Sequence, residues 1–155
     1  MIQLTSIIHG AVRRARRGFT LIEMLIVVAI IGILASLVLV GLGPVQRQGR
    51  DARRISDLRQ VQTGLELYFV KNGDYPASQA WSELTTTLTG AGIGVSNVPQ
   101  DPSSASGKTY QYGSNGSSYV VAAGLEDTGS SRLGDDSDGF IMGISCADPV
   151  YCIQL

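Results

Sequence analysis

The chain has 155 residues, 12 Lys and Arg against 13 Asp and Glu, and a formal net charge of −1. This length gives room for one domain, or for one small domain with a membrane-spanning or fibrous element. The single histidine is His9, in the N-terminal segment. Histidine-based nucleophile activation and histidine metal sites are therefore excluded for the rest of the chain.

Charge is distributed unevenly along the chain. Four arginines and no acidic residue precede Phe19, six basic and three acidic residues lie in 45–71, and two basic residues oppose nine carboxylates from Asn72 onward. The order is a basic leader, a basic stem of net charge +3 (6 − 3) and an acidic head of −7 (2 − 9). The basic residues flank an apolar run instead of forming a compact basic domain, so nucleic-acid binding is not indicated.

Residues 19–40 form an almost unbroken apolar segment of 22 residues, interrupted by Glu23. A secretory signal peptide has a shorter apolar core, of about 7–15 residues, followed by a small-x-small cleavage site. A membrane anchor fits better, because 22 residues span roughly 33 Å as a helix. The leader arginines then predict that residues 1–18 stay in the cytoplasm. A plain anchor does not explain Glu23, since an intramembrane carboxylate costs about 2.5–3.5 kcal/mol and usually has a partner or a function.

A cut between Gly18 and Phe19 would create an α-ammonium group four residues before Glu23. The run Gly18-Phe19-Thr20-Leu21-Ile22-Glu23, after a basic leader and before a long apolar helix, resembles the class III signal of type IV pilins and type II secretion pseudopilins. In that family a membrane peptidase cleaves after the glycine and methylates the new N-terminal phenylalanine. The glutamate then pairs with the N-terminal amine of a neighbouring subunit. The resemblance implies that Gly18 and Phe19 form the cleavage site, that Phe19 is methylated and that Glu23 acts in assembly.

The segment after the apolar run is predicted to be a second helical part. Gly41, Gly43 and Pro44 predict a helix break or kink between a membrane and assembly helix over 19–44 and an amphipathic stem over 45–72. Alternatively, one helix ends there and the next begins at the proline. Apolar residues recur along the stem at three- and four-residue steps and are expected to pack on a sheet: Ala52, Ile55, Leu58, Val61, Leu65 and Tyr68 or Phe69.

The stem also carries a cluster of basic side chains, namely Arg47, Arg50, Arg53 and Arg54. These arginines are interpreted as a solvated face or as ligands of lipid phosphates. The alternative is that they attract the acidic head or stem of another subunit.

Residues 73–155 are predicted to form a globular head. Ser78–Leu88 is expected to be a short helix capped by Ser78. Alternating apolar residues predict strands over 110–112 and 119–123, with a third strand at Gly139–Ser145. The fold class is therefore α+β, a pilin-like lollipop with a long N-terminal helix on an antiparallel sheet of about three strands.

Two further features of the head concern cysteines and carboxylates. Cys146 and Cys152, outside the cytoplasm, are expected to form a disulfide, with two free thiols as the alternative. Five carboxylates within 13 residues suggest a calcium site, because Ca²⁺ takes six to eight oxygen ligands, and the resemblance to major pseudopilins supports it. The alternative is a solvated acidic loop. The five residues are Glu126, Asp127, Asp135, Asp136 and Asp138.

The resemblance implies a structural subunit and not an enzyme, and no nucleophile–base pair supports a catalytic head. A binding domain on a membrane anchor is the remote alternative. The expected course is insertion in the inner membrane with the head outside the cytoplasm, cleavage and methylation by prepilin peptidase, and polymerisation through the N-terminal helix. Expected partners are further copies of the chain, minor pilins or pseudopilins, an inner-membrane assembly platform and membrane lipid. The short head, the Tyr75-Pro76 turn and the acidic loop favour a major pseudopilin of the G type, and a type IV pilin of a surface fibre is the alternative.

Overall fold

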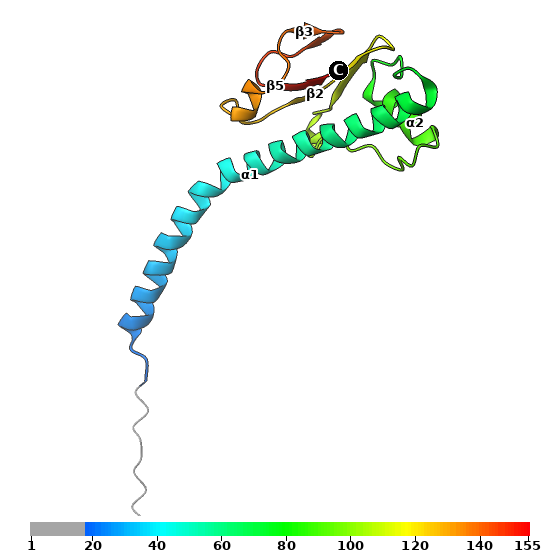
Figure 1. Ribbon diagram of the computed structural model, residues 1–155. Coiled ribbons are helices and arrows are strands. Elements are labelled where there is room, and N and C mark those ends of the chain that lie inside the picture. Colours follow the sequence, from blue (N-terminus) through cyan, green and yellow to red (C-terminus); the bar gives the residue numbers. More distant parts are fainter. Residues whose placement is uncertain (1–17) are drawn as a thin grey trace, which may run out of the picture. The chain divides into compact units, whose positions relative to one another are not determined.

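The computed structural model describes residues 18–155, so the basic leader up to residue 17 lies outside the described residues. Contacts divide the chain into two compact units, one up to Val40 and the other from Gly41 to Leu155. One helix, α1 (Leu21–Asn72), contributes to both units (Figure 1). The second unit contains the strands and the remaining helices of the described residues.

The predicted break in the helix at Gly41, Gly43 and Pro44 is wrong, whereas a kink at these residues stays a prediction. α1 continues through these three residues with Pro44 inside it, so the helical parts expected over 19–44 and 45–72 form one helix. A proline removes one backbone hydrogen bond and crowds the preceding turn. Because α1 has 52 residues, hydrogen bonds on both sides of that turn keep the chain helical.

A three-stranded antiparallel sheet packs on the second half of α1 (Figure 1). Its strand order is β1 (Gln111–Ser114), β2 (Tyr119–Gly124) and β5 (Val150–Gln154). In the register, Val121 of β2 lies between Tyr112 and Ile153. The sheet and the helix confirm the predicted α+β class.

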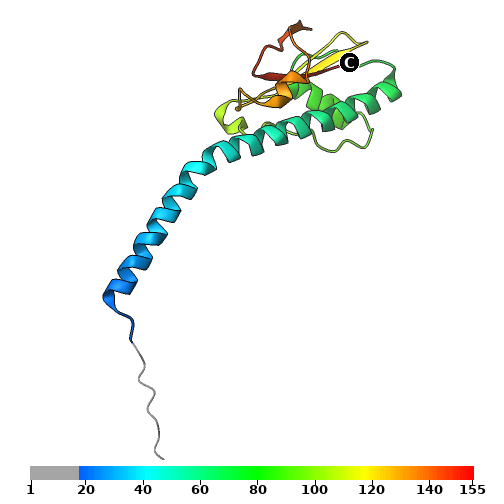
Figure 2. The same ribbon diagram turned by 60° about the vertical axis from the view of Figure 1, so that its left-hand side comes forward.

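The central strand β2 is buried on both faces. Its odd-numbered residues belong to the main core, together with the apolar stripe of α1. Its even-numbered residues Val120 and Ala122 belong to a second cluster with Ile144, Cys146 and Cys152. A hairpin of β3 (Phe140–Ile141) and β4 (Ile144–Ser145) contributes to this second cluster, on the face of the sheet away from α1 (Figure 2).

The prediction of a third sheet strand at Gly139–Ser145 is wrong. Met142 and Gly143 have left-handed backbone conformations, with φ of 48° and 87°, and they turn the chain back on itself. The segment therefore forms the β3–β4 hairpin, a separate two-stranded sheet. The third strand of the main sheet is β5, which contains Cys152.

The apolar stripe of α1 is confirmed at its centre, where Leu58, Val61 and Leu65 are buried, whereas Ala52 is exposed. The short helix α2 (Trp81–Gly90) begins three residues later than predicted. Ser78 precedes the helix, where its Oγ accepts a hydrogen bond from the amide of Ala80 and donates one to Glu83. Two short 3₁₀ helices occupy Ser104–Ser106 and Ser131–Gly134.

Candidate functional site

The processing motif lies where α1 begins. Gly18, Phe19 and Thr20 precede the helix in non-helical backbone, and Phe19 is 78 % exposed. Non-helical, exposed backbone is the form in which proteases reach a peptide bond. The Gly18–Phe19 bond, which the resemblance implies as the cleavage site, therefore lies in exposed, non-helical backbone of the described chain.

Glu23 has a partner within the chain that the sequence analysis missed. Its Oε2 accepts hydrogen bonds from the amide of Thr20 at 2.8 Å and from the Thr20 hydroxyl at 2.7 Å. The amide of Glu23 donates in return to Thr20 Oγ1 at 3.3 Å. This reciprocal arrangement is a capping box, whose T-x-x-E signature is present in the sequence. Thr20 thus starts the helix and holds the carboxylate before any neighbouring chain is present.

The part of α1 that follows has the length and composition of a membrane-spanning helix. Its most apolar 18-residue window has a mean hydropathy of 3.1, and none of this window is buried within the chain. Exposed leucine, isoleucine and valine side chains continue to Leu39. So large an exposed apolar surface requires lipid or other helices to cover it.

A buried ion network joins α1 to two loops of the head. Arg54 is fully buried, although its position off the apolar stripe predicted a solvated side chain. Its guanidinium donates hydrogen bonds to Asp101 at 2.8 and 3.0 Å and to Asp51 at 2.6 Å. It also lies 2.9 Å from a carboxylate oxygen of Glu126. Such a set of partners is needed because a buried charge without them costs several kcal/mol.

Arg50 and Asp51 complete this network. Arg50 donates to Glu126 at 2.9 Å, and Asp51 accepts from the backbone amides of Glu126 and Asp127 at 3.0 and 2.9 Å. The arginines Arg50 and Arg54 are therefore paired within their own chain, which corrects the interpretation of them as a solvated or lipid-binding face. Arg47 and Arg53 are exposed.

The five carboxylates predicted as one calcium site do not lie together. The hydrogen bond from Arg50 is the main cause that lowers the pKa of Glu126. Burial acts to raise this pKa, but the hydrogen bond and charge of Arg54 lower it further, to about 2. Asp127 accepts hydrogen bonds from the Gly129 amide and from Gln48. Asp135 is exposed and, like Glu126 and Asp127, is not part of the carboxylate group described next.

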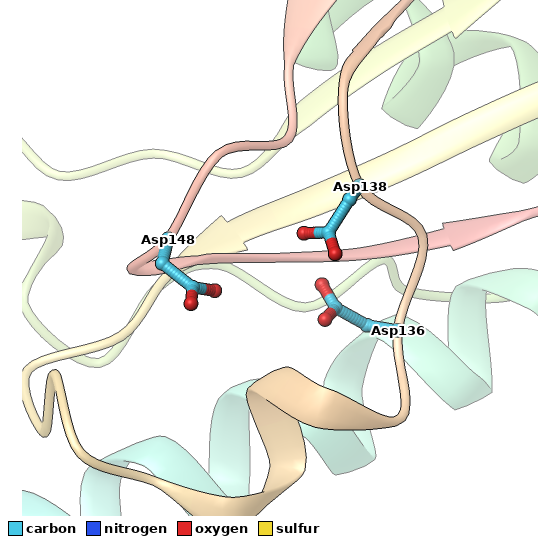
Figure 3. A group of neighbouring side chains, drawn as sticks. All are labelled: Asp136, Asp138 and Asp148. Atoms are coloured by element: carbon cyan, nitrogen blue, oxygen red, sulfur yellow. The ribbon is translucent and has the colours of Figure 1, made fainter.

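Asp136 and Asp138 meet a third carboxylate, Asp148, which the sequence analysis did not include (Figure 3). One oxygen from each of the three lies within 4.8 Å of the others. Asp136 Oδ2 accepts a hydrogen bond from the Cys152 amide at 2.7 Å, whereas Asp136 Oδ1 is buried without a hydrogen-bond partner. Burial raises the pKa of Asp136, and the negative charges of Asp138 and Asp148 raise it further. The hydrogen bond from the Cys152 amide acts to lower this pKa but does not outweigh them. We call these three residues the acidic cluster.

Cys146 and Cys152 form the predicted disulfide, with their Cα atoms 5.8 Å apart, so the alternative of two free thiols is wrong. Both cysteines are buried in the second core cluster. The loop that they close contains Asp148. The cysteine prediction therefore placed Asp148 in a closed loop, but it gave no indication of which residues the loop faces.

An exposed apolar helix, started by a Gly-Phe-Thr-Leu-Ile-Glu motif and continued onto a small antiparallel sheet, defines a pilin-like protein. The family model for the prokaryotic N-terminal methylation motif matches residues 13–39. This match covers the leader arginines, the Gly18–Phe19 bond and Glu23.

Three relatives are each named type II secretion system core protein G. The Vibrio cholerae protein is 32% identical over 116 residues, covering 70% of this chain and 77% of that protein. The Aeromonas hydrophila protein is 32% identical over 99 residues, covering 58% of this chain and 69% of that protein. The Pseudomonas aeruginosa protein is 37% identical over 67 residues, covering 43% of this chain and 47% of that protein. No solved structure matches the chain at a significant level. The chain belongs to the family of type II secretion system core protein G, and it is a pseudopilin.

Proposed function

We propose that this pseudopilin is a structural subunit of a type II secretion-like filament. The processing motif directly before an exposed apolar helix carries the proposal, and the names of the relatives favour a secretion filament over a surface pilus. In this account the chain is inserted in the inner membrane by the N-terminal part of α1, with its head outside the cytoplasm. Prepilin peptidase cleaves the Gly18–Phe19 bond and methylates Phe19. The subunit then polymerises with copies of itself and with minor pseudopilins on an inner-membrane assembly platform.

Glu23 gives this proposal its chemical logic. Cleavage creates an α-ammonium group at Phe19, directly before Thr20 and four residues before Glu23, the two residues that form the capping box. The capping box holds the Glu23 carboxylate at the end of α1, where the amine of a neighbouring chain could pair with it as the helices bundle. An uncut chain has the carboxylate but lacks the amine. Processing and assembly are thereby coupled through one ion pair.

The change Glu23→Gln tests this proposal because it removes the charge and keeps the shape of the side chain. We expect the variant to be inserted and cleaved, while the yield of sheared filaments falls about tenfold or more. The physical reason is that a charge-assisted hydrogen bond contributes about 1.5–3 kcal/mol, and about 1.4 kcal/mol corresponds to a factor of ten. A matched control is Ser36→Ala, which removes a hydroxyl that bonds to the Ile33 carbonyl of the same helix. Normal filament yield from Glu23→Gln would refute the pairing.

We further propose that the acidic cluster holds a structural Ca²⁺. Oxygen ligands lie about 2.3–2.6 Å from Ca²⁺, so two of them can be at most about 4.6–5.2 Å apart, which suits oxygens within 4.8 Å of one another. The buried Asp136 Oδ1, without a hydrogen-bond partner, is an oxygen that a cation would satisfy. Asp136, Asp138 and Asp148 would supply carboxylate ligands, and the cation would neutralise their mutual repulsion. The three carboxylates therefore fit a Ca²⁺ ion. Only two of the five predicted ligands, Asp136 and Asp138, are among them.

A further inference from the structure

We propose that the Cys146–Cys152 disulfide holds the acidic cluster together, so that binding of a divalent cation depends on the redox state of the chain. This inference rests on the proposed calcium site and adds the requirement that the Cys146–Cys152 disulfide is intact. The disulfide lies next to the cluster, and its loop supplies one of the three carboxylates. The disulfide is buried, with Cys146 0% and Cys152 1% exposed.

Backbone hydrogen bonds connect each cysteine to the segment that carries the other two carboxylates. The Cys146 amide donates to the Gly139 carbonyl at 2.7 Å, next to Asp138. The Cys152 carbonyl accepts from the Ser137 amide at 3.3 Å, and the Cys152 amide donates to Asp136 Oδ2 at 2.7 Å. The segment 136–139 is therefore hydrogen-bonded to one cysteine at each of its ends.

Asp148 lies on the opposite side of the cluster from this segment, in the loop between the cysteines (Figure 3). Asp148 is exposed, and the three carboxylates repel one another at their short separation. The loop is also held by the hydrogen bond from the Leu125 amide to the Pro149 carbonyl at 2.8 Å, and in this proposal the disulfide is the covalent restraint that keeps the loop from moving outward. A chain without the covalent link keeps the same three ligands, and in this proposal the remaining hydrogen bonds hold them together less tightly.

The coupling must act in both directions. A link that raises the affinity for the cation is itself stabilised by the cation to the same degree. Reduction by dithiothreitol transfers two electrons and two protons, which converts the disulfide into two thiols while the reagent forms its own cyclic disulfide. Tenfold coupling therefore shifts the reduction potential of Cys146–Cys152 by about 30 mV to more negative values when Ca²⁺ is bound.

The test is a calorimetric titration of Ca²⁺ into the full chain in detergent micelles. We compare the oxidised chain with the double variant Cys146→Ser/Cys152→Ser and with Asp148→Asn. A matched control is Asp135→Asn, which removes an exposed charge near the cluster without removing a cluster residue. We expect the double variant to bind about 10–100-fold more weakly, as is typical when groups that orient metal ligands are lost, and Asp135→Asn to bind as the unmodified chain does.

The fluorescence of Trp81, which packs against Tyr110, reports whether the double variant folds. A second measurement, on the unmodified chain, tests the proposal if the variant does not fold. The unmodified chain is equilibrated with dithiothreitol at several Ca²⁺ concentrations, and the midpoint of disulfide reduction is determined. We expect the midpoint to move to stronger reducing conditions as Ca²⁺ increases.

The outcomes separate the two proposals. Equal Ca²⁺ affinity of the oxidised chain and a folded double variant, or a reduction midpoint independent of Ca²⁺ in a chain that binds Ca²⁺, overturns the role of the disulfide and leaves the calcium site standing. A lack of Ca²⁺ binding by the oxidised chain overturns the calcium site, and the inference with it. Weaker binding without the disulfide supports both.

Discussion

Arg54 places a positive charge in the interior of the head, and its three carboxylate partners determine whether that charge is tolerated. The hydrogen bonds to Asp101 and Asp51 raise the pKa of Arg54 against the effect of burial. Burial acts to raise the pKa of Asp101, but the hydrogen bonds from Arg54 and the Ser103 amide outweigh it and lower that pKa. Both members of the pair are thus held in their charged forms, and the network joins α1 to the loops around Asp101 and Glu126.

The change Arg54→Met tests the network. Methionine fills part of the same space but leaves Asp101 and Asp51 buried without their cation, so we expect a loss of about 3–5 kcal/mol in the free energy of unfolding. The measurement is urea unfolding of the full chain in detergent, followed by the fluorescence of Trp81. Arg47→Met on the exposed face of α1 is the control and is expected to change stability by less than about 0.5 kcal/mol. Equal unfolding midpoints for the two variants would contradict the account.

The burial of Arg54 could not be predicted from sequence, because Asp101, which binds it most extensively, lies 47 residues away. Helical periodicity places Arg54 beside the apolar stripe but does not say what approaches that side of the helix. The motif around Gly18, Phe19 and Glu23 was predictable because it is contiguous. Asp148 was missed because its neighbours Asp136 and Asp138 are reached through tertiary structure, across the hairpin and the disulfide loop.

At the scale of elements, β1 and the β3–β4 hairpin approach each other closely at Gly113. A Cβ atom there would lie 2.6 Å from the Met142 carbonyl oxygen and 3.2 Å from the Met142 Cβ. Gly113→Ala must therefore displace the turn of the hairpin, and we expect a loss of about 1–3 kcal/mol in the free energy of unfolding. The control is Gly124→Ala on β2, where an added Cβ meets nothing within 4 Å. Urea unfolding compares the two, and a Gly113→Ala variant as stable as the control would show that the contact is not restrictive.

The elements differ in how far their sequence patterns could predict them. The long helix follows from two successive signals, an apolar run and an amphipathic stripe, and it was predicted over nearly its whole length. The hairpin was mistaken for one strand because Met142 gives no signal for a left-handed conformation and the single glycine that follows it, Gly143, is a weak turn signal by itself. Pro44 led to the opposite error, because it predicted a break where the helix is continuous. The long helical segments on both sides override this local helix-breaking signal.

At the scale of the whole molecule, the two units have different tasks. The exposed apolar helix of the first unit has little to pack against within the chain, and it is proposed to find its partners in the membrane and then in neighbouring subunits. The second unit is a small α+β domain with its own core, ion network and disulfide. This division suits a subunit that polymerises through one part and presents the other.

The central claim is that the chain is processed at the Gly18–Phe19 bond and then polymerised. Mass spectrometry of the N-terminal peptide, taken from filaments assembled by the full-length chain, tests it most directly. The account predicts a chain that begins at methylated Phe19 and lacks the first 18 residues. Filaments built from chains that begin at Met1, or at Phe19 without a methyl group, would contradict it.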